Sequence, residues 1–158
     1  MEDFNINYYA HHTRFIYCLF QNYSNMNNLG NCQEAFEKVS EESLLRDFMS
    51  RAYYTVFLKA RNEMFLSDSV SHSDVLNQLD PKYKNMFRDL KTFRVDADYK
   101  TDYPITYPLK NDKVKGQYYL ERLISIMDKF LSATGEQLAY SHVTLRENKK
   151  RKFLIGEI

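Results

Sequence analysis

The chain is poor in residues that break or cross-link regular structure. Its 158 residues include only 4 Gly, 3 Pro and 2 Cys, and no Trp. Because domains made of many short strands need frequent turn residues, so little Gly and Pro favours long helices. Cys18 and Cys32 do not form a Cys-x-x-Cys pair. We therefore expect two free thiols in a reducing environment, the cytoplasm.

Neither an excess of one charge nor a long apolar segment is present. The 22 Lys and Arg residues nearly balance the 21 Asp and Glu residues, which leaves a net charge of +1. Any binding to nucleic acid must therefore depend on a local group of cations rather than on overall attraction to phosphate. No apolar segment approaches the length that crosses a membrane, and the first residues do not resemble a signal peptide. We expect a soluble protein without a membrane partner.

Motifs of several common enzyme classes are also missing. The sequence has no glycine-rich phosphate loop, no His-Glu-x-x-His, no paired-cysteine zinc site and no Gly-x-Ser-x-Gly turn. His11 and His12 are adjacent, so on a helix they point to different faces, which does not suit two ligands of one metal ion. We expect these histidines at the surface, and neither a metal nor an organic cofactor.

Apolar residues at helical spacing predict a long helix in the middle of the chain. Between residues 45 and 64 they recur every three or four positions, which places them on one face of a helix. Ser40 followed by Glu41 and Glu42 predicts the helix start, because acids favour the first turn. The helix is expected to run to about Ser67. Its apolar stripe consists of Leu45, Phe48, Ala52, Val56, Ala60 and Met64.

Helical spacing also predicts elements on both sides of this central helix. In the first of them, one apolar face is expected to consist of Phe15, Ile16, Leu19, Phe20 and Tyr23. Asp80 and Pro81 predict another helix start, since Asp can cap free backbone amides and Pro fits the first helical position. The predicted helices span residues 8–23, 32–39, 40–67, 72–79, 81–97 and 113–131, the last of them capped by Asn111 and Asp112.

Two regions are expected to interrupt the helices. Pro104 and Pro108 exclude regular helix between residues 98 and 108. Gly135 predicts the end of the last long helix, unless residues 137–142 extend it. The chain shows no internal repeat and has the length of one domain, residues 1–158. The expected fold is all-α, an up-and-down bundle of four or five helices.

Three motifs follow one another along this bundle. Residues 50–61 contain Arg-Ala-Tyr-Tyr-Thr-Val-Phe and then Ala-Arg, residues 71–72 are Ser-His, and residues 93–99 read Phe-Arg-Val-Asp-Ala-Asp-Tyr. In this order and spacing they resemble the HEPN family, small helical bundles named for higher eukaryotes, prokaryotes and nucleotide binding. The resemblance covers about residues 43–133.

The resemblance implies a bundle that often forms homodimers, with the signature helices facing a shared cleft. Many HEPN proteins are metal-independent ribonucleases that act as toxins, in phage defence or in RNA-guided immunity. Others bind RNA or a partner nucleotidyltransferase without cutting. Catalytic members usually carry an Arg followed a few residues later by a His. Here the residue that follows Arg94 at the matching position is Tyr99, a departure that bears on catalysis more than on fold.

Arg94, Tyr99, Asp98 and His72 are the candidate catalytic residues. Metal-free RNA cleavage needs a base for the 2′-hydroxyl, an acid for the leaving oxygen and a cation for the phosphate charge. Arg94 suits the last role, or it pairs with Asp96 or Asp98 at a helix end. A phenol is a poor base near neutral pH, so Tyr99 would hydrogen-bond the phosphate or donate a proton. His72 suits base work if it faces the cleft, and otherwise lies at a helix cap or margin. Asp98 either orients these groups or begins a turn.

The central helix supplies the candidate RNA-binding residues Arg51, Tyr53, Tyr54 and Arg61. Tyr53 and Tyr54 point about 100° apart on a helix, so we expect one in the core and one at the cleft or a dimer seam. The two arginines either contact phosphate or pair with acidic residues of the helix at 81–97. The basic run Arg146–Lys152 is either a solvated tail or, if it lies near the cleft, a salt-sensitive RNA contact.

Two functions remain open from the sequence. The first is an RNA-acting HEPN protein, a metal-independent endoribonuclease that serves as a toxin or phage-defence effector. The second is a non-catalytic module whose cleft holds RNA, a nucleotide or a partner protein. The expected partners are RNA, a second copy of the chain, and an antitoxin or nucleotidyltransferase.

Overall fold

The computed structural model describes residues 6–99 and 113–156 of the chain. Within these ranges the chain forms eight α-helices and no strand, which confirms the all-α prediction. The helices are α1 Ile6–Gln21, α2 Gln33–Glu37, α3 Glu41–Glu63, α4 His72–Gln78, α5 Pro81–Tyr99, α7 Lys113–Ser132, α8 Gly135–Leu138 and α9 His142–Leu154. The expected break at 98–108, including Pro104 and Pro108, and the cap at Asn111 and Asp112 lie largely outside the described residues.

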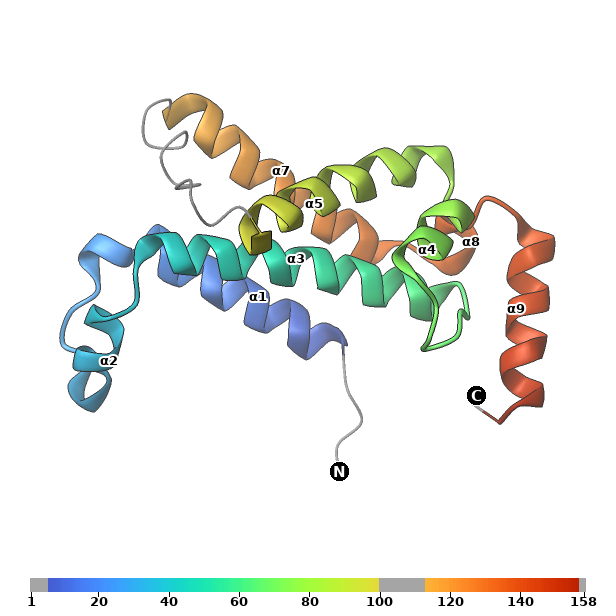
Figure 1. Ribbon diagram of the computed structural model, residues 1–158, viewed down its shortest axis with the longest axis horizontal. Helices are drawn as coiled ribbons and strands as arrows, with labels where there is room; N and C mark the ends of the chain where they lie inside the picture. The colour runs from blue at the N-terminus through green and yellow to red at the C-terminus, as the bar shows by residue number, and fades with distance from the viewer. Residues whose placement is uncertain (1–5, 100–112, 157–158) are drawn as a thin grey trace.

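The four long helices run back and forth along the longest axis of the molecule (Figure 1). Helix α3 lies at the centre and packs against α1, α5 and α7. Helix α2 lies at one end of the bundle. The short helices α4 and α8 lie at the other end, where α9 stands crosswise to the long helices. The architecture is therefore an up-and-down bundle with a separate C-terminal helix attached to one end.

The predicted stripe on α3 forms the centre of the core. All six of its residues are fully buried, at 0% exposure, which confirms the prediction. Ser40 caps the helix as expected, because its hydroxyl accepts a hydrogen bond from the Ser43 amide at 3.0 Å. The helix ends at Glu63 rather than near Ser67. Phe65 adopts a left-handed backbone with φ of 55°, and this turns the chain away from the helix.

The predicted apolar face of the first helix packs against the core, with Phe15 as the exception: Ile16 is buried, and Leu19, Phe20 and Tyr23 are partly buried against the core. Ala10, Thr13 and Ile16 are its buried residues, whereas the Phe15 side chain is 59% exposed. Because neighbouring residues on a helix point about 100° apart, burial of Ile16 against α3 turns Phe15 towards solvent. The expectation that Phe15 belongs to the buried face was therefore wrong.

The starts of α4 and α5 agree with the sequence. Ser71 caps α4 in a reciprocal arrangement with Asp74, and the Asp80 carboxylate accepts a hydrogen bond from the Lys82 amide at 3.0 Å. Helix α5 continues to Tyr99, beyond the predicted end at residue 97. Its last turn therefore carries the final residues of the third motif in helical conformation.

The C-terminal region differs most from the prediction. Helix α7 ends at Ser132, and Gly135 begins α8 instead of ending α7. The basic run Arg146–Lys152 is part of a regular helix, α9, whose start is capped by Ser141. A regular, capped helix with fixed contacts to the bundle replaces the solvated tail that the sequence allowed.

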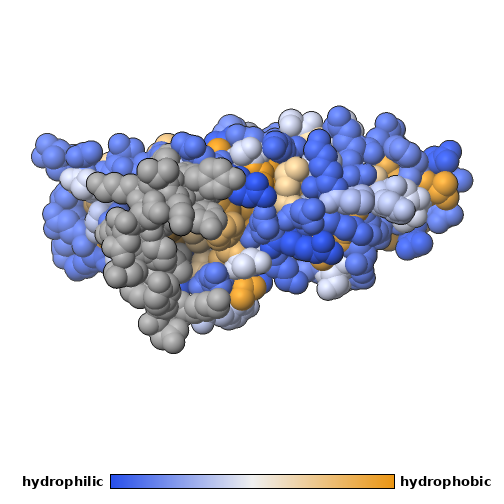
Figure 2. Space-filling model, turned by 90° about the horizontal axis from the view of Figure 1, so that it is seen from above, coloured by the Kyte–Doolittle hydropathy of each residue, from blue (hydrophilic) through white to orange (hydrophobic). Residues whose placement is uncertain are grey.

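The surface seen from above is mostly hydrophilic, with small hydrophobic areas between the polar ones (Figure 2). No helix in the described part of the chain is long and apolar enough to cross a membrane.

Candidate functional site

Helix α3 presents the tyrosine pair at its contact with α5. Tyr53 is completely buried and Tyr54 is partly buried, as the helical geometry predicted. Their rings meet edge to face, with centroids 5.5 Å apart. Tyr53 also packs against Phe87 of α5 at 5.4 Å. Tyr53 is thus fixed in the core, and Tyr54 lies beside it at the partly exposed edge of the α3–α5 contact.

Arg94 on α5 lies against the rings of Tyr53 and Tyr54. Its guanidinium is 5.8 Å from the Tyr53 ring centre and 5.2 Å from that of Tyr54. Its Nη2 donates a hydrogen bond to the Tyr54 hydroxyl at 2.9 Å, and its Nε donates to Asp98 at 2.9 Å. The side chain is only 16% exposed. The fold therefore brings the tyrosine pair and Arg94 together.

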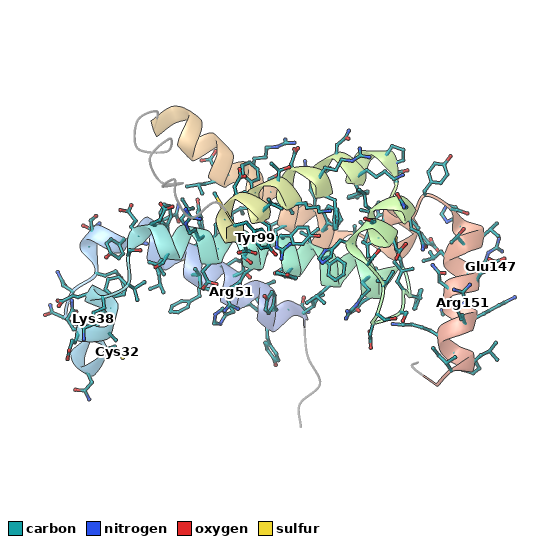
Figure 3. All side chains as sticks on the ribbon, viewed as in Figure 1. Cys32, Lys38, Arg51, Tyr99, Glu147 and Arg151 are labelled. Atoms are coloured by element: carbon teal, nitrogen blue, oxygen red, sulfur yellow. The ribbon has the colours of Figure 1, made fainter. Side chains whose placement is uncertain are left out.

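The last turn of α5 completes the surroundings of Arg94. Asp98 lies one turn after Arg94 and also accepts a hydrogen bond from the Ser50 hydroxyl of α3 at 3.3 Å. The Tyr99 ring lies 5.4 Å from the guanidinium, and its hydroxyl accepts a long contact from Nη2 at 3.4 Å. Tyr99 is 66% exposed, so its ring forms the outer edge of the group (Figure 3).

Of the two positions that the sequence allowed for His72, the structure has the one that faces the tyrosines. Ser71 caps α4, and His72, the first residue of the helix, turns inward. Its ring stacks on Phe57 at 4.4 Å and on Tyr53 at 5.4 Å. Its Nδ1 and the Tyr53 hydroxyl form a short hydrogen bond. The fold thus places an imidazole next to Tyr53, whose ring Arg94 also contacts.

The protonation states of this pair follow from burial. Burial raises the pKa of Tyr53, and Arg94 opposes this only in part, so the phenol stays protonated. Burial, and then the charges of Arg94 and Lys91, lower the pKa of His72, so the imidazole is neutral at pH 7. A protonated phenol next to a neutral imidazole allows two tautomers: the phenol donates to Nδ1 and the ring hydrogen is on Nε2, or Nδ1–H donates to the phenol oxygen and Nε2 is free to accept a proton.

We call Tyr53, Tyr54, His72, Arg94, Asp98 and Tyr99 the Arg94 cluster. Burial alone would lower the pKa of Arg94, but Tyr54, Tyr99 and Asp98 outweigh it and raise the pKa, so the guanidinium keeps its charge. The cluster thus combines a fixed cation, a neutral imidazole and phenol hydroxyls. Within the part of the chain that the structure describes, no group of His, Cys, Asp and Glu residues could hold a metal ion.

Arg51 and Arg61, the other predicted RNA contacts, lie outside the cluster. Arg51 forms an ion pair with Asp47 of its own helix and lies 5.7 Å from the Tyr9 ring of α1. Arg61 lies 6.0 Å from the Phe57 ring, and its closest acidic partner is Asp68, at 3.6 Å. The expectation that both pair with acids of the helix at 81–97 was wrong, because nearer acids in α3 and in the following loop neutralise them.

Three neighbours of the cluster were not singled out from the sequence. Ser50 binds Asp98, Phe57 stacks on His72, and Lys91 contributes positive charge near His72. Ser50 lies one helical turn before Tyr54, and Lys91 lies one turn before Arg94, so helical spacing could have indicated both. Nothing local could have indicated the stacking of His72, because Phe57 belongs to another helix.

No family model, curated protein or solved structure matches this chain.

Proposed function

We propose that this protein acts on RNA as a HEPN-type, metal-independent endoribonuclease. The observation that carries the proposal is the position of Arg94, whose charged fork is held between Asp98 and the Tyr54 hydroxyl beside a neutral imidazole. A fixed guanidinium suits a phosphate oxygen because its planar donors match phosphate geometry and it carries its charge at any working pH. Fixed donors of this kind stabilise the charge that develops on phosphorus during cleavage.

The proposed reaction is attack of a ribose 2′-oxygen on the adjacent phosphorus, with loss of the 5′-oxygen of the next nucleotide. Arg94 stabilises the negative charge on the phosphate. His72 takes the 2′-hydroxyl proton at Nε2, in the tautomer whose Nδ1–H donates to the Tyr53 oxygen. Tyr99, at the exposed edge, gives its proton to the leaving oxygen, and Asp98 holds Arg94 in position.

The first experiment measures cleavage of single-stranded RNA by the purified protein with EDTA present. Cleavage is expected to persist, because EDTA removes metal ions and the proposed acid, base and cation are all side chains of the protein. Arg94→Ala is expected to lower the rate by about 100-fold to 1,000-fold, the usual effect of losing a transition-state donor. Arg88→Ala, which removes an exposed arginine from the same helix, is the matched control and should leave the rate unchanged. Persistent cleavage by Arg94→Ala would remove Arg94 from the mechanism.

Two conservative variants separate charge, geometry and proton transfer. Arg94→Lys keeps the positive charge but loses the planar guanidinium, which can bind two phosphate oxygens at once. A rate close to that of Arg94→Ala would indicate that this bidentate contact, and not the charge alone, is needed for cleavage. Tyr99→Phe keeps the ring and loses the hydroxyl. A large fall in rate with this variant supports proton donation, whereas an unchanged rate would rule it out.

A non-catalytic role is the second candidate. Tyr99 stands where catalytic HEPN members usually have His, the residue most often assigned acid or base work. In that case the same surface binds RNA, a nucleotide, or a partner such as an antitoxin or nucleotidyltransferase. The protein would then bind RNA or co-purify with its partner, and no condition would produce cleavage.

A role as toxin or phage-defence effector, and the homodimer that the resemblance implies, belong to the same proposal. Expression in a bacterial host should halt growth, and Arg94→Ala should restore it, because a toxin that cleaves RNA depends on its active site. Growth arrest that persists with Arg94→Ala would contradict this role. Mass photometry of the purified protein measures whether it forms the expected dimer.

A further inference from the structure

Helix α9 carries cations that the rest of the molecule does not neutralise. Five of its thirteen residues are Lys or Arg and one, Glu147, is acidic, although the whole chain has a net charge of only +1. In the described part of the chain, the arginines of α1, α3 and α7 and Arg94 of α5 form ion pairs. No ion pair or hydrogen bond described there involves the side chain of Arg146, Lys150 or Arg151. These charges are therefore available to an anionic partner.

One face of α9 holds the helix to the bundle. Leu145 and Asn148 are its buried residues, and the Asn148 amide donates to the Met64 carbonyl at 3.2 Å and to the Gln78 side chain at 2.8 Å. A buried amide with two hydrogen bonds to fixed groups sets the rotation of the helix. The orientation of the exposed faces of α9 is therefore defined, rather than variable as in an unattached tail.

An exposed face of α9, adjacent to the buried one, presents cations and an aromatic ring together. Residues four apart, or three and seven apart, share a face of a helix, so Arg146, Lys149, Lys150 and Phe153 point in similar directions. All four are exposed, Phe153 by 70%. The Lys149 ammonium also lies 5.3 Å from the ring centre of Phe65, in the loop after α3. We call this surface the α9 face. Figure 3 shows α9 with Glu147 and Arg151 labelled. Along the long axis α4 lies between α9 and Tyr99, so the α9 face is separate from the Arg94 cluster (Figure 1).

We propose that the α9 face binds single-stranded RNA outside the Arg94 cluster. Arg146, Lys149 and Lys150 contact phosphates, and a base stacks on Phe153. Cations that follow the backbone together with exposed rings are the usual means of binding single strands without sequence preference. This proposal rests on the proposed function, because it takes RNA as the substrate, but it concerns binding and not cleavage.

The arrangement of apolar residues favours RNA over a membrane surface. A helix that lies on a membrane separates a continuous apolar face from a charged face. On α9 the exposed Phe153 lies on the same face as the cations, and the consecutive Phe153, Leu154 and Ile155 point in different directions around the helix. An anionic single strand with unstacked bases fits this mixture better than a lipid bilayer does.

The test is the affinity of the whole protein for fluorescent 2′-O-methyl RNA, which cannot be cut through a 2′-hydroxyl. Binding is measured at several salt concentrations with strands of about 4 and about 16 nucleotides, the range that single-strand sites cover. The double variant Arg146→Ala/Lys150→Ala should lower the slope of log affinity against log salt by about 1.4, because each phosphate contact contributes about 0.7. The matched control, Lys82→Ala/Lys84→Ala on α5, removes the same charge and should change the slope little.

Phe153 provides an independent arm of the test. Phe153→Ala should weaken binding of the long strand by about tenfold, the equivalent of about 1.4 kcal/mol of stacking. Phe153→Tyr keeps the ring and should retain affinity, whereas Leu154→Ala, which removes an exposed side chain that is not a ring, should have little effect. The short strand should respond less to either change if it is held mainly at the Arg94 cluster.

Each outcome decides the proposal. Loss of affinity in both the double variant and Phe153→Ala supports it, even if no RNA is ever cleaved, so failure of the proposed function is distinguishable. Unchanged affinity in the double variant overturns it, and unchanged affinity in Phe153→Ala alone overturns the stacking contact. Binding of the protein to anionic phospholipid vesicles, lost in the same variants and without RNA binding, would assign the α9 face to a membrane instead.

Discussion

The Arg94 cluster and the α9 face both contain arginine and aromatic residues, but the environment of the charge differs. Arg94 is 16% exposed, paired with Asp98 and surrounded by three tyrosine rings. Arg146 and Lys150 are exposed and have no described partner in the chain. A cation fixed by its neighbours is already in position to stabilise the charge of a transition state. An exposed cation without a partner instead attracts phosphates without fixed geometry, which suits binding of the RNA backbone.

The largest difference between the two regions is expected in stability. Tyr53→Ala should lower the free energy of unfolding by about 3–5 kcal/mol, because it removes a fully buried ring from the core. Phe153→Ala should change it by no more than about 0.5 kcal/mol, because that ring is exposed. Urea denaturation followed by circular dichroism measures both. Similar losses from the two variants would mean that the α9 face is buried in solution.

A second variant tests how α9 is attached. A Cβ at Gly135 would collide with the backbone carbonyl of Glu63, so Gly135→Ala should destabilise the protein by about 1–3 kcal/mol. The exposed Glu136→Ala, one residue along α8, is the control. Hydrogen exchange should show α8 and α9 losing protection before α3 does. Equal loss of protection across all helices would contradict a separately attached α9.

The pH dependence of stability should also separate the regions. The pKa of His72 is lowered in the folded protein, so the unfolded chain binds a proton more readily than the folded one. The stability that His72 contributes is therefore present above its ordinary pKa of about 6.5 and is lost as the pH falls through the lowered value. His72→Gln should reduce the loss of stability between about pH 7 and about pH 5, and His142→Gln on α9 is the matched control. An identical pH dependence in wild type and His72→Gln would contradict the buried position of His72.

The smallest effect is expected at Arg51. Its ion pair with Asp47 is partly exposed, so Arg51→Ala should cost only about 0.5 kcal/mol of stability. Because Arg51 lies against α1 and not in the cluster, RNA cleavage should not change (Figure 3). A fall in RNA affinity as large as that of Arg146→Ala/Lys150→Ala would restore the phosphate contact that the sequence suggested for Arg51.

The features predicted well from sequence are those that depend on neighbours along the chain. The buried stripe of α3, the caps at Ser40 and Asp80, and the full burial of Tyr53 but not of Tyr54 all follow from helical spacing or from local hydrogen bonds. Each involves residues within a few positions of one another, so the sequence contains the whole interaction.

The features predicted poorly are those that depend on which helix packs against which face. Phe15 was placed on the buried face because it lies next to Ile16 in an apolar stretch, but the packed face centres on Ile16 and leaves Phe15 in solvent. The partner of Arg61 was misassigned because the loop after α3 folds back and brings Asp68 near it. The partner of Arg51, Asp47, lies one turn earlier in the same helix, so helical spacing could have indicated it. Gly135 was read as a helix end, but its close contact with Glu63 is a requirement of packing.

The sequence by itself determined that this protein is helical, where its central helix lies and which residue types accompany Arg94, because spacing and capping are local properties. Only the tertiary structure decided that His72 faces Tyr53, that Arg94 contacts Tyr54, and that the basic C-terminal run is a helix held by Asn148. These contacts join segments that are distant in the chain, and their free energy comes from burial that exists only when the bundle is assembled.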